Sequence, residues 1–137
     1  MKTKLVVLLS LIILIGIFGT LSVYFGFIVV SVEELNMDLN VENRVGFNAG
    51  TDDIHFGTIY PGGESKRTIN IANNNKFPIV VYITNEGELA EWVESKSSIE
   101  LNPGENTSIA YIATVPPFIE ERMYYGTSKI TMNRKFF

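Results

Sequence analysis

Few side chains in this 137-residue sequence have the chemistry of a catalytic or metal site. His55 is the single histidine, and there is no cysteine. A histidine-based zinc site, a blue-copper site and a cysteine nucleophile each need residues that this composition lacks. No serine stands in a Gly-x-Ser-x-Gly turn that would pair it with His55. We therefore interpret His55 as a strand residue near the surface of a domain.

Carboxylates form three short clusters, at Asp52-Asp53, at Glu86 and Glu88, and at Glu120-Glu121. None lies in the D-x-[DN]-x-[DN]-G pattern of a calcium loop. Asp52 and Asp53 follow Gly50-Thr51 and are typical of a turn in which side chains accept hydrogen bonds from nearby backbone N–H groups. We expect no enzyme activity, no metal and no cofactor. A small hydrolase that uses Asp52, Asp53 and neighbouring carboxylates is an alternative interpretation.

Two apolar segments are candidates for binding a partner. In Val115-Pro116-Pro117-Phe118-Ile119, two prolines prevent regular strand pairing, so Phe118 and Ile119 lie in a loop. Because soluble proteins rarely expose apolar patches, we expect this loop to fold over the end of the core, and docking of a partner is the alternative. Phe136 and Phe137 present the same choice at the end of the sequence.

Two further residues have a possible surface or core role. Asn106-Thr107-Ser108 matches the N-x-[ST] sequon, so Asn106 is a candidate for glycosylation. Trp92 is the one tryptophan, and we expect it in the core with its N–H bonded to the backbone.

The apolar character of the chain is concentrated at the N-terminus, where residues 5–32 contain no charged side chain. At about 1.5 Å per residue, a helix of this length reaches roughly 42 Å and exceeds the ~30 Å hydrocarbon core of a bilayer. Residues 1–32 are therefore predicted to form a transmembrane anchor that contacts the lipid bilayer through residues 5–32. A cleaved signal peptide is the alternative, although its apolar region is normally shorter, about 7 to 15 residues.

Charges on the two sides of this segment predict its orientation. Lys2 and Lys4 precede it, whereas Glu33 and Glu34 follow it. Basic residues near a span stay on the cytoplasmic side, so we expect a cytoplasmic N-terminus and an extracytoplasmic domain over residues 33–137.

Small residues mark one face of the predicted helix. Gly19, Ser22 and Gly26 are three and four residues apart and so lie on one face of a helix, which would let two helices approach closely. This face is a candidate for homo-oligomerisation.

Residues 33–137 carry 9 basic and 15 acidic side chains, a balance of −6. That sign argues against a nucleic-acid partner and against a polybasic lipid-binding surface, both of which need a concentrated positive field.

The pattern of apolar residues in this domain is that of strands. Alternation with period two, together with β-branched and aromatic residues, predicts strands near 35–41, 68–72, 79–84, 99–101, 109–115 and 125–132. Residues 88–94 are predicted as a short irregular strand, with one helical turn as the alternative. Turn residues such as Pro61-Gly62-Gly63 and Pro103-Gly104 separate these segments. The domain is predicted to be all-β, an immunoglobulin-like antiparallel β-sandwich of about seven strands.

Four segments of this domain also resemble a known pattern. They are residues 55–63 (HFGTIYPGG), 67–73 (RTINIAN), 101–105 (LNPGE) and 123–130 (MYYGTSKI). Together they are similar to the turn and core residues of the CARDB, NEW3 and major-sperm-protein-like immunoglobulin-like modules, over roughly residues 45–134. The resemblance implies a fold and no active site. An anchor followed by one such domain also resembles small archaeal envelope proteins and, more distantly, accessory archaellum proteins.

The sequence predicts a non-catalytic single-pass protein of the cell membrane that displays an extracytoplasmic interaction domain to an unknown protein or envelope partner. A structural subunit of a cell-envelope or appendage complex is the alternative, and differs in the permanence of its contacts.

Overall fold

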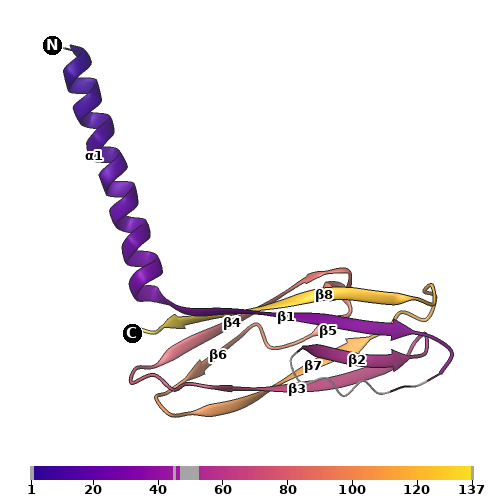
Figure 1. Ribbon diagram of the computed structural model, residues 1–137. Helices are drawn as coiled ribbons and strands as arrows, with labels where there is room; N and C mark the ends of the chain where they lie inside the picture. The colour runs from indigo at the N-terminus through magenta and orange to yellow at the C-terminus, as the bar shows by residue number, and fades with distance from the viewer. Residues whose placement is uncertain (1, 45, 47–52, 137) are drawn as a thin grey trace.

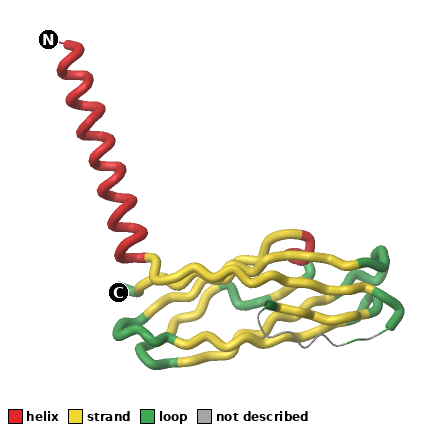
Figure 2. Tube along the Cα trace, viewed as in Figure 1, coloured by secondary structure: helices red, strands yellow, loops and turns green. Residues whose placement is uncertain are grey.

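The computed structural model describes residues 2–44, 46 and 53–136. One helix precedes a domain made almost entirely of strands (Figure 1, Figure 2). The elements in chain order are α1 (Lys2–Val23), a π-helical turn η1 (Tyr24–Ile28), β1 (Val29–Val41), β2 (Ile54–Ile59), β3 (Glu64–Ala72), β4 (Ile79–Gly87), a 3-10 turn η2 (Glu88–Glu91), β5 (Val93–Glu94), β6 (Ser98–Leu101), β7 (Asn106–Thr114) and β8 (Met123–Arg134).

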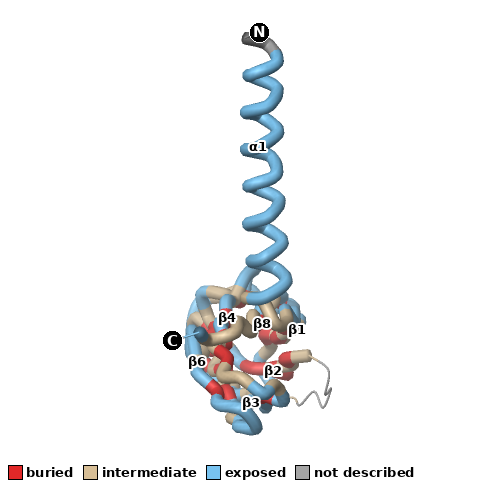
Figure 3. The backbone as a smooth tube through the Cα atoms, turned by 90° about the vertical axis from the view of Figure 1, so that its left-hand side faces the viewer, coloured by how far each residue is buried: buried red, intermediate tan, exposed pale blue. Residues whose placement is uncertain are grey.

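The helical segment has no face that the rest of the chain covers. Its side chains from Lys4 to Phe27 are exposed, as Figure 3 shows along the length of α1. Residues Lys4–Ile28 have a mean hydropathy of 2.7, long and apolar enough to cross a membrane, a property that a signal sequence near the N-terminus shares. A helix that is apolar on all sides and unburied needs an apolar medium around it.

The strand region begins earlier than the sequence indicated. We expected the membrane segment to continue to Val32, but β1 starts at Val29 and pairs with β8 from its first residue, Val29 opposite Asn133. Residues 29–32 are mostly valine, and β-branched side chains favour a strand wherever a pairing partner is present.

Two sheets face each other in the domain. The larger has the strand order β2-β1-β8-β4-β6 and the smaller β3-β7-β5. Side chains from both sheets form one buried cluster, which includes Leu39, Val81 and Ile130 of the larger sheet and Ile109 and Tyr111 of the smaller. Within the described residues there are eight strands, where the sequence predicted about seven, and the strand without a counterpart among the predicted ranges is β2.

One strand pair departs from the expected antiparallel arrangement. β1 and β2 are parallel, with Asp38 opposite His55 and Val41 opposite Ile59. The connection over residues 42–53 has the length that a parallel crossover requires, about a dozen residues. A pattern of turns and alternation does not specify this choice, since both directions bury the same face of β2.

Residues 88–94 combine the two forms that the sequence suggested. η2 replaces the first half of the predicted irregular strand, and only Val93–Glu94 pair with β7. Gly87 turns the chain with a φ of 87°, and the Trp92 backbone N–H donates to the Leu89 carbonyl at 3.0 Å. A positive φ at the end of β4 therefore starts the turn, and glycine accepts it at little cost.

Tyr111 is the largest fully buried side chain. Its hydroxyl lies 2.9 Å from Ser128 Oγ, also buried, and joins β7 to β8 across the interface of the sheets. Burial raises the pKa of Tyr111 above its usual value. Trp92, expected in the core, is only half-buried and contacts Tyr124, with ring centroids 4.6 Å apart and the rings tilted by 54°.

Candidate functional site

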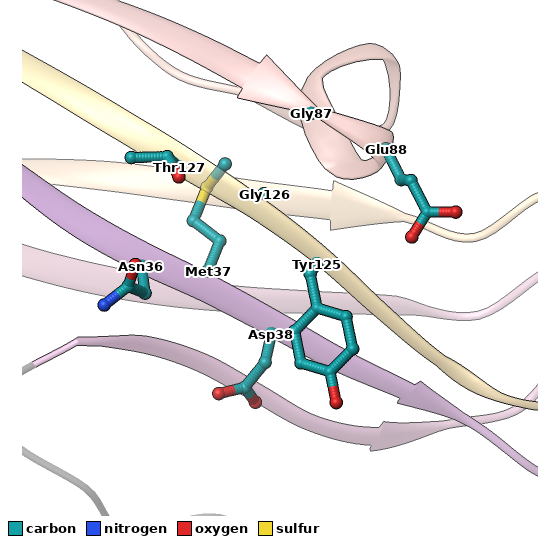
Figure 4. Close-up of a pocket in the computed structure, with 8 residues that line it drawn as sticks. All are labelled: Asn36, Met37, Asp38, Gly87, Glu88, Tyr125, Gly126 and Thr127. Atoms are coloured by element: carbon teal, nitrogen blue, oxygen red, sulfur yellow. The ribbon is translucent and has the colours of Figure 1, made fainter.

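A shallow hollow of about 550 Å³ lies on the outer face of the larger sheet, at the end far from α1 (Figure 4). Its lining comes from β1, β8 and the turn after β4, and consists of Asn36, Met37, Asp38, Gly87, Glu88, Tyr125, Gly126 and Thr127. Figure 4 shows the Tyr125 ring beside Asp38, with Glu88 projecting from the start of the turn.

Two opposed glycines line this hollow. Gly87 of β4 pairs with Gly126 of β8, and the two backbones approach closely there. A Cβ on Gly126 would lie 2.9 Å from the Glu86 carbonyl oxygen and 3.0 Å from Met37 Cε. The close approach of β4 to β8 thus depends on glycine at position 126.

Replacing Gly126 by alanine is expected to lower the free energy of unfolding by about 1–3 kcal/mol, because a backbone oxygen and a buried methionine have to move. Chemical unfolding of the full chain in detergent measures the change. Thr127→Ala, at the next position, is the control and is expected to change stability by less. Equal effects of the two substitutions would show that β4 and β8 can move apart at position 126 without loss of stability.

The carboxylates beside the hollow are engaged by cations or by a histidine. Arg122 donates to Glu88 through Nη2 at 2.6 Å and through Nη1 at 3.3 Å. These hydrogen bonds hold the pKa of Glu88 below its ordinary value. Asp38 Oδ2 contacts His55 Nδ1, an interaction that follows from the parallel register of β1 and β2.

The chemistry of this arrangement is that of charge pairing. The lowered pKa of Glu88 favours its ionised form, which is paired with Arg122. Among the described residues, no group of three or more His, Cys, Asp or Glu side chains has the geometry to hold a metal ion. The Asp38–His55 contact and the Glu88–Arg122 pair escaped the sequence analysis because each joins strands through a register that no local motif encodes.

The remaining carboxylate candidates are placed differently. Asp53 accepts a hydrogen bond from the Asn36 backbone N–H at 2.8 Å, a partner on β1 rather than the nearby turn backbone that the sequence predicted. Asp52 lies outside the described residues. Glu121 accepts from Asn43 Nδ2 at 2.7 Å, on the loop that precedes β8.

The chain shows no match to the family models, curated proteins or solved structures with which it was compared. Arguments about its function therefore depend on its own residues.

Phe118 is the most exposed large apolar side chain, with 96% of its surface accessible. It lies in the loop 115–122 between β7 and β8, at the end of the domain far from α1. We expected this loop to fold over the core; Val115 and Ile119 pack there, whereas Phe118 does not. The loop is fixed on both sides of Phe118: Gly62 N–H donates to the Val115 carbonyl at 3.1 Å, and Tyr124 Oη donates to the Glu120 carbonyl at 2.9 Å.

The second apolar candidate lies at the opposite end of the domain. Phe136 is 54% exposed, and its ring lies 5.5 Å from the Arg134 guanidinium carbon. Phe137 is outside the described residues. The C-terminal end of the described chain is beside the base of α1 (Figure 1).

Asn106 is the exposed first residue of β7. Ser108, the third residue of the sequon, donates through Oγ to Asn70 Oδ1 at 2.6 Å. Asn106 thus lies on an accessible strand end, and its glycosylation stays a prediction.

The helix has a groove beside part of the predicted small-residue face. Gly16, Gly19 and Thr20 line this groove, so it shares Gly19 with the expected set, whereas Ser22 and Gly26 are not among its lining residues. Self-association through Gly19, Ser22 and Gly26 also stays a prediction.

Proposed function

We propose that this chain is a single-pass membrane protein whose immunoglobulin-like domain is displayed outside the cytoplasm and binds a protein partner without catalysis. The apolar helix of residues 4–28 supports the membrane part of the proposal. Lys2 and Lys4 before the helix, and Glu33 and Glu34 after it, support the orientation.

The exposure of Phe118 carries the proposal. An exposed phenylalanine side chain does not gain the free energy of burial, about 1.5–3 kcal/mol. The ring is nevertheless held outward by a loop with hydrogen bonds on both sides, from Gly62 to Val115 and from Tyr124 to Glu120. An aromatic side chain on such a fixed loop can dock without the entropic cost of ordering the loop.

The charges around Phe118 indicate the chemistry of its partner. Exposed carboxylates at this end include Glu120 and Glu121. Arg122 on the same loop pairs with Glu88 and also lies 3.9 Å from Glu120. We infer a partner with an apolar pocket that receives Phe118 and a basic rim that faces the carboxylates.

A long free strand edge supports a second candidate, the permanent subunit of an envelope or appendage complex. β3 is an edge strand of nine residues, paired with β7 on one side. Part of its other side faces β2, where Ser65 Oγ donates to the Phe56 carbonyl at 3.0 Å, but Thr68, Asn70 and Ala72 are exposed. Strand edges of this kind are normally protected in monomers, and pairing with another chain is one way to protect them.

Replacing Phe118 by alanine is expected to weaken partner binding by about 30-fold or more, the effect of removing a binding hot spot worth at least ~2 kcal/mol. The partner is first captured in intact cells by a photo-crosslinking amino acid at position 118, with position 82 on the outer sheet face as control. Affinity for the purified partner is then measured for Phe118→Ala and for Tyr82→Ala, which removes an aromatic side chain that is 46% exposed.

The outcomes distinguish reversible binding from a permanent subunit, and both from the absence of a role for Phe118. A specific adduct at position 118 and a selective loss of affinity support reversible binding through Phe118. A chain that never occurs alone after extraction in mild detergent supports the permanent subunit. Identical adducts at positions 118 and 82, or equal affinities of the two variants, would contradict the role of Phe118.

A further inference from the structure

A basic and aromatic cluster lies where the helix joins the domain. We call Lys76, Arg134, Lys135 and Phe136 the membrane-side cluster. Pairing of Val29 with Asn133 brings the end of β8 beside the start of β1, and pairing of Ile79 with Arg134 brings the start of β4 to the same place. Figure 1 shows this end of the chain next to the base of α1.

The length of the helix sets the depth of this cluster. A bilayer core of about 30 Å takes up roughly 20 helical residues, from Leu5 to about Tyr24. Tyr24, Phe25 and Phe27 then lie in the interfacial layer, where aromatic side chains accumulate. β1 begins directly after Ile28, so the membrane-side cluster is within a few strand widths of the lipid headgroups.

The cluster is fixed in place by the fold. Lys135 N–H donates to the Pro78 carbonyl at 2.9 Å. The buried Asn73 donates through Nδ2 to the Phe77 carbonyl at 2.9 Å and to the Leu101 carbonyl at 3.1 Å, which holds the loop that carries Lys76. The Arg134 guanidinium carbon lies 4.3 Å from the centre of the Phe77 ring. These cations therefore face outward from a rigid end.

The charge of this end differs from that of the whole domain. Among the described residues, neither Lys76 nor Arg134 is within salt-bridge distance of a carboxylate, and Lys135 pairs with Glu100. Glu105 lies on the turn whose backbone bonds to Asn73, so this end of the described chain holds three cations and two carboxylates. The first carboxylates of β1, Glu33 and Glu34, are about 13 Å or more along the strand, beyond the ~10 Å screening length at 0.1 M salt. The balance of −6 thus conceals a local positive end, which the sequence alone did not reveal.

We propose that the membrane-side cluster binds the anionic headgroups of the bilayer in which α1 is inserted, with Phe136 entering the interfacial layer. The proposal rests on the proposed membrane span. Its chemistry is the attraction of cations to anionic headgroups in the leaflet that faces the domain, on the side away from the cytoplasm, reinforced by an exposed aromatic ring.

The full chain in lipid nanodiscs tests this contact. Because the sequence contains no cysteine, a single fluorophore attaches cleanly at Asn74→Cys beside the cluster or at Thr114→Cys at the far end of β7. Nanodiscs contain phosphatidylcholine alone or an equal mixture with phosphatidylglycerol, with a quencher attached to the headgroups. We expect strong quenching at position 74 in the mixture only, weak quenching at position 114, and loss of quenching at high salt.

Charge reversal gives the decisive comparison. Lys76→Glu with Lys135→Glu is expected to reduce the ratio of docked to undocked domain by roughly 30-fold or more, from about 1 kcal/mol per basic residue. Lys66→Glu with Lys96→Glu makes the same change in net charge on exposed strand and loop positions and is expected to leave the quenching unchanged.

Three results would overturn the contact. They are equal quenching at position 74 in both lipid compositions, equal effects of the two double variants, or quenching that depends on protein concentration, which would assign the surface to a second copy of the chain. A chain that does not enter nanodiscs contradicts the membrane span itself. A chain that enters them but shows no quenching at position 74 contradicts only the headgroup contact.

Discussion

Tyr111→Ala is expected to lower the free energy of unfolding of the two-sheet domain by about 3–5 kcal/mol, the cost of removing a fully buried aromatic side chain. The ring lies in the buried cluster that both sheets form, and its loss leaves a cavity beside Ser128. The cost is a large part of the 5–15 kcal/mol that stabilises a typical domain. Urea unfolding of the full chain in detergent, followed by fluorescence of the single tryptophan, Trp92, measures it.

Two further variants separate the contributions of Tyr111. Tyr111→Phe keeps the ring but leaves Ser128 Oγ without its partner in a buried site, at a cost of about 1–3 kcal/mol. Tyr82→Ala removes a half-exposed tyrosine from the outer face and is expected to cost about 1 kcal/mol or less. If Tyr111→Ala were no more harmful than Tyr82→Ala, the two sheets would not share the core that their packing indicates.

The sequence predicted most strands because one face of each is buried and the other is exposed to solvent, so that apolar and polar residues alternate. The alternation at residues 35–41 is an example, with Met37, Leu39 and Val41 buried. The prediction failed at residues 29–32, because valines beside a membrane segment can either extend the helix or begin a strand. Only the pairing of Val29 with Asn133, more than a hundred residues later, decides between the two.

The candidate site was less predictable because it depends on contacts between distant parts of the chain. Asp38 meets His55 through a parallel register, and Glu88 meets Arg122 across the end of the larger sheet. Phe118 shows the same limit: two prolines predict a loop, but the path of that loop depends on hydrogen bonds that Gly62 and Tyr124 donate to its carbonyl groups. Because exposed apolar patches are rare, the sequence favoured a loop that folds over the core.

Three arginines in the helix, at Leu11, Leu14 and Ile17, are expected to abolish stable insertion in the membrane, whereas Leu14→Arg alone is expected to be tolerated. Residues 5–28 contain 17 Leu, Ile, Val and Phe side chains. At about 0.3–0.6 kcal/mol each they favour insertion by roughly 5–10 kcal/mol, and each central arginine opposes it by about 3–4 kcal/mol once the lost apolar side chain is included. With one arginine the free energy of insertion stays favourable, and with three it becomes unfavourable or close to zero.

Extraction of membranes with alkaline carbonate measures the inserted fraction of each variant, and the mass of the native chain shows whether the helix is retained. Phenylalanine at the same three positions is the matched control, since it changes side-chain shape but not apolarity, and should stay in the membrane pellet. A chain with three arginines that pellets like the native protein would mean that α1 does not cross the bilayer. A native chain whose mass lacks residues 1–32 would identify the segment as a signal peptide, and the contact of the membrane-side cluster with lipid would then lose the anchor that holds it at the surface.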